Sequence, residues 1–278
     1  MNKLTELLEQ DAPPSIQEIY RNIRLNCHTP MVALIYRHLA TKPGVLEWAW
    51  ASLSPIMRSG LLPNSAREMA LVASYPKVSS LSLSEIKALD LLEIDVCAIR
   101  YIIAAYHAAN PCNILATLFL LKLLRGSIQL ITEPEDLTSA LSLKTQQEFP
   151  SLPPMVDSEL LPREILGFRP GSASSMGLTP SLYRHLGHWP MWLKVVSEKY
   201  LSVSYQSNEI DNYSKKLYLA AQKKVDFFFT QGEKIKFDDD RPLGSEKDLL
   251  CKTLDTFVET IPTLIIVGAI LNQTLEEY

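Results

Sequence analysis

One eight-residue pattern occurs twice in this chain, and it limits the possible folds more than any other feature. Tyr36–Pro43 reads YRHLATKP and Tyr183–Pro190 reads YRHLGHWP, so five of eight positions match without a gap. A Thr-Pro pair precedes each run, and a leucine follows each at the same distance, at Leu46 and Leu193. Two copies of one helical unit bury their apolar sides by packing together, and the seam between them favours a pocket. We therefore predict two pseudo-symmetric repeats around an inter-repeat pocket.

The rest of the sequence favours an all-α fold. The chain has 278 residues, of which 47% are hydrophobic, and only 10 are glycine. Apolar residues recur at helical spacing, whereas the alternation typical of strands is nearly absent. We predict a first helical repeat over residues 1–130, a linker region over 131–175 that is rich in proline, glycine and serine, and a second helical repeat over 176–278.

Charge and hydropathy restrict the partners and the location. The 27 basic and 31 acidic side chains form no basic stripe, so we expect no nucleic-acid partner. Residues 1–15 are acidic and lack the basic and apolar regions of a signal peptide, which predicts a cytoplasmic protein. The two most apolar runs, Ile114–Leu124 and Ile261–Leu271, are shorter than the roughly 20 residues that span a membrane. They are interpreted as buried core helices, with no membrane partner.

Capping signals predict where several helices begin. A serine or threonine, or an asparagine before proline, can accept hydrogen bonds from the free N–H groups of a first turn. The predicted helices are Ile16–Asn26 after Ser15, Met31–Thr41 after Thr29-Pro30, Cys112–Arg125 after Asn110-Pro111, and Asp248–Val258 and Ile261–Gln273 with a proline break between them.

The polar residues offer few candidates for chemistry. Asn110 either caps the helix that begins at Cys112 or holds a water in a pocket, and the capping interpretation is favoured. His185 and His188 lie one helical turn apart, but nothing suggests a third zinc ligand. The four cysteines form no Cys-x-x-Cys pair. The residues therefore indicate no metal site.

Three segments of the chain resemble the group I 2-haloacid dehalogenases. They are Thr29–Pro43, Ala109–Cys112 and Ser181–Pro190, and the resemblance extends weakly over nearly the whole length. It implies an all-α fold of two pseudo-symmetric repeats, usually a homodimer, with the active site between the repeats. It also implies hydrolysis of the carbon–halogen bond of small 2-halocarboxylic acids by a water that an aspartate activates. No metal, no other cofactor and no covalent ester are implied.

The resemblance assigns roles to individual positions. The water-positioning asparagine falls on Asn110, and the serine before the catalytic aspartate falls on Ser181. The aspartate itself falls on Leu182. The aromatic pocket wall falls on Met31 and Leu34, and the family's tyrosine and isoleucine fall near Leu254 and Val258.

Leucine cannot accept a proton, so the chain lacks the general base, a group worth about 10²- to 10⁴-fold in rate. Three interpretations stay open. The protein is a hydrolase with an altered base, a non-catalytic binder of a small carboxylate or apolar molecule, or a structural helical dimer.

Histidines are the candidates for an altered base. On one continuous helix Met31, Leu34 and His38 would lie at i, i+3 and i+7, a single stripe, which places His38 on the pocket wall. His185 lies at i+3 from Leu182 and is the best available substitute base, because imidazole titrates near neutrality. Alternatively, both are core histidines whose ring nitrogens bond to backbone carbonyls.

Overall fold

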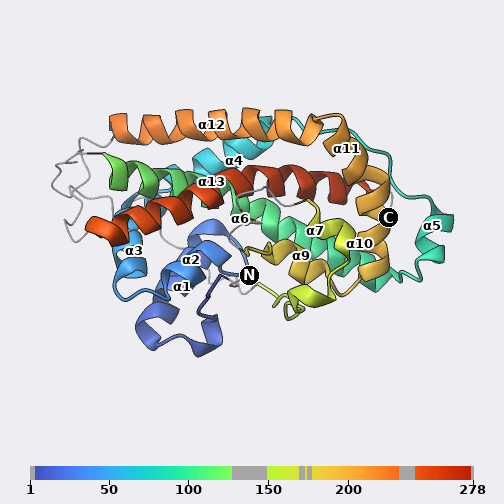
Figure 1. Ribbon diagram of the computed structural model, residues 1–278, viewed down its shortest axis with the longest axis horizontal. Coiled ribbons are helices and arrows are strands. Elements are labelled where there is room, and N and C mark those ends of the chain that lie inside the picture. Colours follow the sequence, from blue (N-terminus) through green and yellow to red (C-terminus); the bar gives the residue numbers. More distant parts are fainter. Residues whose placement is uncertain (1–3, 127–148, 169–172, 174–176, 232–241, 277–278) are drawn as a thin grey trace.

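The structure is a computed structural model that describes residues 4–126, 149–168, 173, 177–231 and 242–276. Within these residues the regular secondary structure is helical and no strand occurs, as the sequence predicts. Figure 1 labels most of the helices. In chain order they are η1 (Glu9–Asp11), α1 (Pro14–Cys27), α2 (Leu34–Leu39), α3 (Val45–Arg58), α4 (Leu61–Val72), α5 (Leu83–Ala88), α6 (Glu93–Arg125), η3 (Ser158–Leu160), α7 (Arg163–Leu166), α9 (Ser181–Leu186), α10 (Pro190–Val196), η4 (Ser197–Leu201), α11 (Ser202–Gln206), α12 (Glu209–Gln231) and α13 (Gly244–Gln273).

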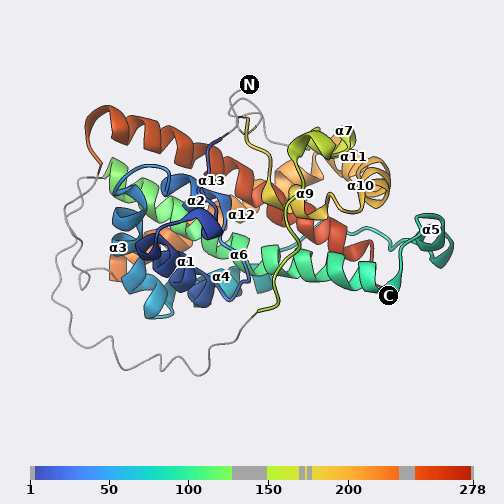
Figure 2. The same ribbon diagram turned by 90° about the horizontal axis from the view of Figure 1, so that it is seen from below.

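Two long helices, α6 and α13, form the centre of the molecule. They lie side by side along its length, with α1, α2 and α3 towards one end and α9, α10 and α11 towards the other (Figures 1 and 2). Both are long and apolar enough to cross a membrane by length and composition alone. However, 83% and 89% of their most apolar stretches are buried inside the fold. They are therefore core helices, as predicted.

The predicted proline breaks in these helices are wrong. Pro111 lies inside α6 and Pro262 lies inside α13, and each helix continues through its proline. An internal proline removes one helical hydrogen bond and costs about 3 kcal/mol. Burial of apolar side chains on both sides of each proline outweighs this cost. Asn110 is consequently an interior residue of α6 and not a helix cap.

Each of the two hydrophobic cores contains side chains from both halves of the chain. The first core joins α1, α3 and α4 to the C-terminal half of α6 and the N-terminal half of α13, for example through Leu53, Phe119 and Leu254. The second core joins α9 and α10 to the opposite halves, for example through Ile102, Trp192 and Ile266. Because the C-terminal half of α6 packs with the N-terminal half of α13, the two helices run antiparallel, and they connect the two ends of the molecule.

The repeated pattern forms two similar short helices, α2 and α9. Both are six residues long, and each is followed by another helix. The helix predicted over Met31–Thr41 is too long, because α2 begins only at Leu34. Met31 precedes that helix and packs into the second core, whereas Leu34 packs against the first. Of the predicted linker, residues 131–148 lie outside the described residues, and the following part contains η3 and α7.

Candidate functional site

A carboxylate joins the two short helices at the seam between them. Glu6 Oε2 accepts a hydrogen bond from Arg37 Nε of α2 at 2.9 Å, and Glu6 Oε1 accepts one from Arg184 Nη1 of α9 at 2.8 Å. The side chains of Glu6, Arg37 and Arg184 are only 12%, 5% and 10% exposed. We call this arrangement the Glu6 bridge.

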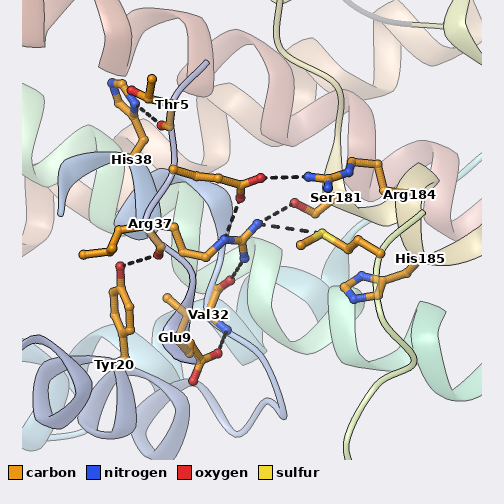
Figure 3. Close-up of polar contacts among 12 residues, drawn as sticks. Thr5, Glu9, Tyr20, Val32, Arg37, His38, Ser181, Arg184 and His185 are labelled. Atoms are coloured by element: carbon orange, nitrogen blue, oxygen red, sulfur yellow. Dashed lines mark hydrogen bonds and ion pairs between the residues drawn. The ribbon is translucent and has the colours of Figure 1, made fainter. Parts of the chain in front are cut away.

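The arginines have further partners that fix their positions. Arg37 Nη1 donates to the carbonyl of Val32, and Arg37 Nη2 donates to Ser181 Oγ at 3.0 Å, so α2 also contacts α9 directly (Figure 3). Arg184 Nε donates to the carbonyl of Val156 at 3.1 Å. Two buried guanidinium groups therefore share a single carboxylate, and the Glu6 bridge carries a formal excess of one positive charge.

A segment without regular secondary structure, residues 4–8, presents Glu6 to the arginines. The N–H of Leu7 donates to the carbonyl of Arg37 at 2.9 Å, and the carbonyl of Leu7 accepts from the Tyr20 hydroxyl at 3.0 Å. The carbonyl of Thr5 lies 2.8 Å from Nδ1 of His38. We call residues 4–8 the N-terminal segment. It is attached to α1 and α2 by these hydrogen bonds, and its side chains Leu4 and Leu7 pack against the first core.

Two opposing effects set the ionisation of Glu6. Burial alone raises the pKa of its carboxyl group, because the charged form loses hydration. The charges and hydrogen bonds of Arg37 and Arg184 act in the opposite direction and outweigh burial, so the pKa lies below its ordinary value. Glu6 is accordingly an anion at neutral pH.

A cleft of about 740 Å³ opens beside the Glu6 bridge. Among the described residues, four arginines line it, namely Arg21, Arg24, Arg37 and Arg184, against one carboxylate, that of Glu9. Glu9 is itself paired with Arg24 and accepts a hydrogen bond from the N–H of Val32 at 3.3 Å. The remaining lining is largely apolar and includes Met31, Leu152, Pro153 and Met155. A cleft with this lining suits a small anion that carries an apolar group.

The structure brings some of the predicted site residues to this cleft. Met31 and His185 line it. Ser181 contacts Arg37, one of the lining residues. Within the described part of the chain, the other predicted residues do not line the cleft: Leu34, His38, Asn110, Leu182, Leu254 and Val258. Leu182 and Leu254 are 0% exposed and belong to the second and first core, while Val258 borders a separate cavity between α11, α12 and α13.

The stripe that was expected to place His38 on the pocket wall does not form. Since Met31 lies before α2, its side chain does not share a helical face with His38. Arg37 faces the cleft instead, and His38 turns towards the carbonyl of Thr5 (Figure 3). The interpretation of His38 as a histidine bonded to a backbone carbonyl agrees with this contact.

His185 lies in the cleft lining, but its environment opposes protonation. Its Nδ1 is 2.8 Å from the Tyr106 hydroxyl. Burial lowers the pKa of His185 to about 4, and the neighbouring charges of Arg37 and Arg184 contribute to the shift. A general base works best when its pKa is near the operating pH, so His185 is a weak base at neutrality. In the described part of the chain, no three His, Cys, Asp or Glu side chains are grouped so that they could hold a metal ion.

Sequence reasoning missed Glu6, Arg37 and Arg184. One signal for the arginines was present, because the arginine recurs in both copies of the pattern. No local signal marks Glu6, which is separated by 31 residues from Arg37 and by 178 from Arg184.

Comparison with known proteins places this fold among the 2-haloacid dehalogenases. A structure described as D-2-haloacid dehalogenase mutant with D-2-CPA aligns with a TM-score of 0.74 and 12% identity, covering 98% of this chain and 96% of that one. A second, of D-2-haloacid dehalogenase with L-LA, aligns with a TM-score of 0.73 and 14% identity over the same shares. No protein-family model matches the chain.

A sequence relative points the same way. The configuration-inverting 2-haloacid dehalogenase of Alcaligenes xylosoxydans xylosoxydans is 24% identical over 237 residues, which cover 79% of this chain and 76% of the relative. The resemblance to the group I 2-haloacid dehalogenases is thereby confirmed, and the chain is dehalogenase-like in sequence and in fold.

Proposed function

We propose that this protein binds a small 2-substituted carboxylic acid in the basic cleft and is not an efficient dehalogenase. The observation that carries the proposal is the lining of the cleft, where the four arginines of the described residues outnumber the carboxylates of Glu9 and the adjoining Glu6. The dehalogenase names of its relatives support a 2-substituted acid as the ligand class. A cytoplasmic homodimer with its site between two repeats is part of the same proposal.

Among the cleft residues that the structure describes, none is a well-placed base, which supports the second half of the proposal. The position that the resemblance assigns to the water-activating aspartate holds Leu182, a wholly buried apolar residue. Glu9 is paired with Arg24, and the two arginines of the Glu6 bridge hold the pKa of Glu6 below its ordinary value. Glu6 is therefore a poor proton acceptor, and Glu9 is engaged by Arg24. His185 keeps open a slow hydrolase as the second candidate, since it lines the cleft in its neutral form.

The first prediction is that the wild-type protein binds 2-chloropropionate without releasing chloride efficiently. Because a bound ligand stabilises only the folded state, either enantiomer should raise the melting temperature in a thermal-shift assay. Chloride release, followed by ion chromatography, should stay well below roughly 1 per second, in the lower range of dedicated enzymes. Steady release at that rate or faster would show that another group activates water. No binding of either enantiomer would contradict the carboxylate-binding function.

Leu182→Asp tests the assigned position of the missing base, and Leu186→Asp is its matched control. Both leucines lie on α9 in the second core and are 0% exposed. Both variants should lose stability, because each buries a carboxyl group whose pKa is raised by its apolar surroundings. Only Leu182→Asp should gain chloride release over the wild type. Equal release by the two variants would refute the assignment of Leu182.

A further inference from the structure

The Glu6 bridge has the geometry of a bound carboxylate ligand. Each carboxylate oxygen accepts from a different guanidinium group, at 2.9 and 2.8 Å, and both arginines come from helices of the scaffold. The carboxylate, in contrast, comes from a segment without helix or strand. Charge-assisted hydrogen bonds between arginine and a carboxylate are strong and directional, and they do not require that the carboxylate belong to the protein. A free monocarboxylate would satisfy the same donors.

We propose that the space between Arg37 and Arg184 is a carboxylate-binding site whose resident ligand is Glu6, and that an external monocarboxylate takes this position when the N-terminal segment withdraws. The inference deepens the proposed function and rests on it, because it states where the acid group of the ligand binds and what controls access. The N-terminal segment is then a displaceable plug of the site.

The surroundings indicate what kind of acid fits. Arg37 and Arg184 also line the cleft, so an acid bound between them directs its other atoms into the cleft. Met31 and Met155 provide apolar surface there, and Met155 Sδ lies 3.9 Å from Arg37 Nη2. The neutral ring of His185 adds no competing charge. A short monocarboxylate with a small apolar substituent therefore matches the site.

Charge and connectivity determine the cost of displacement. The two buried guanidinium groups need at least one anion, because a buried unpaired charge is strongly unfavourable. Glu6 supplies that anion at an effective concentration on the order of millimolar or more, since it is tethered to the same chain. An external acid must compete with it. Removing the Glu6 carboxylate should thus both destabilise the protein and strengthen its binding of free acids.

Chemical rescue tests this directly, with Glu6→Ala and sodium acetate as the probe. Glu6→Ala should melt at a lower temperature than the wild type, and acetate at about twenty times its Kd should raise that melting temperature by roughly 3 °C. Sodium chloride at equal ionic strength should not. Glu9→Ala is the matched control, because it also removes a cleft carboxylate paired with an arginine. Acetate should rescue it no better than sodium chloride does, since the Arg24 side chain is 32% exposed and partly hydrated.

Calorimetric titration with 2-chloropropionate separates this inference from the proposed function. Glu6→Ala should bind the acid at least about tenfold more tightly than the wild type, because the tethered competitor is gone. If both proteins bind it with the same Kd, or if acetate rescues both alanine variants equally, the inference is overturned and the binding function remains. If acetate rescues Glu6→Ala but the wild type binds no 2-chloropropionate, the inference holds and the proposed function fails.

Glu6→Gln covers the case in which the alanine variant does not fold. Its side chain keeps the length of glutamate and one acceptor oxygen, but it loses the charge. The same two comparisons apply, with acetate expected to stabilise Glu6→Gln above the sodium chloride control. No stabilisation and an unchanged Kd would overturn the inference.

Discussion

At the residue scale, His185 is a buried imidazole that stays neutral next to two cations. Its side chain is enclosed by the fold, with the residue 6% exposed, and its Nδ1 contacts the Tyr106 hydroxyl. Burial, with the charges of Arg37 and Arg184, brings its pKa to about 4, whereas a histidine in an unfolded chain titrates near 6.5. Between these two values the unfolded chain binds a proton that the native state does not.

This difference predicts a loss of stability on mild acidification. As the pH falls from about 6.5 to about 4, proton uptake by the unfolded state should lower the free energy of unfolding by up to about 3 kcal/mol through His185. His185→Gln cannot be protonated yet can still bond to Tyr106, so its stability should fall less over this range. Urea unfolding at each pH measures the effect. Burial also lowers the pKa values of His38 and His107. The His185→Gln variant should therefore still lose some stability as the pH falls.

The exposed neighbour provides the control for this prediction. His188→Gln changes an exposed histidine three residues further along the chain, in the turn after α9. It should keep most of the wild-type pH dependence, because burial and the two arginines lower the pKa of His185 more than His188 does. If His185→Gln and His188→Gln show the same profile, His185 is not the group responsible. Glu6 acts in a lower window, because its folded pKa is depressed and its contribution is lost only as the pH falls below about 4.5.

Residue-level predictions from the sequence depended on knowing where a helix begins. A helix that began at Met31 would place His38, and not Arg37, on the pocket wall, but α2 begins three residues later. A helix turns by about 100° per residue, so neighbouring residues face different directions and the true start changes which interactions are possible. Glu6 was beyond the reach of such reasoning, because its contacts with two distant arginines arise only in the folded chain.

At the element scale, α9 is packed more tightly than its counterpart α2. The second copy of the pattern has Gly187 where the first has Ala40. The N–H of Val156 donates to the carbonyl of Arg184 at 3.0 Å, which brings that segment against the end of α9. A Cβ at residue 187 would overlap Val156 Cγ2 and lie 2.8 Å from Leu161 Cδ2. An alanine at this position would therefore require the side chains of Val156 and Leu161 to move.

Gly187→Ala should therefore destabilise the protein by about 1–3 kcal/mol, the usual cost of an extra methyl group in a packed interior. Gly167→Ala is the control, since it also follows a short helix with ordinary backbone angles, and its Cβ would meet only the Glu164 carbonyl oxygen at 3.3 Å. Guanidinium unfolding compares the two. Equal losses would show that Val156 and Leu161 give way without cost.

The central helices show where element prediction fails. Asn110-Pro111 and the proline at 262 both read as helix boundaries, yet α6 and α13 pass through them. The apolar runs on the C-terminal side of each proline were correctly interpreted as buried helices. Proline marks a probable boundary from local geometry alone, whereas the antiparallel packing of α6 against α13 is a tertiary effect.

At the scale of the whole molecule, the two cores depend on each other. Both α6 and α13 extend through both cores. One half of each helix packs in the first core, and the other half packs in the second. If one core unfolded alone, the half of α6 and the half of α13 that belong to it would expose their apolar side chains to water. The all-α class was predictable from periodicity. The sharing of α6 and α13 between two cores was not, because periodicity does not say which helices pack together.

We expect a single unfolding transition as a result. Leu53→Ala in the first core and Ile102→Ala in the second remove fully buried side chains, and each should cost about 2–5 kcal/mol. In scanning calorimetry both variants should show one transition at a lower temperature, with equal van't Hoff and calorimetric enthalpies. Two separate transitions in either variant would mean that the cores unfold independently.

The Glu6 bridge also has a consequence for how the chain can change over generations. One carboxylate pairs with two arginines on different helices, so a substitution at either arginine changes how much the other contributes to stability. Loss of both together can be tolerated better than loss of one, provided that Glu6 is replaced as well, because no buried charge is then left alone. Positions 6, 37 and 184 should therefore drift as a unit, whereas the surface residues around them remain free to vary independently.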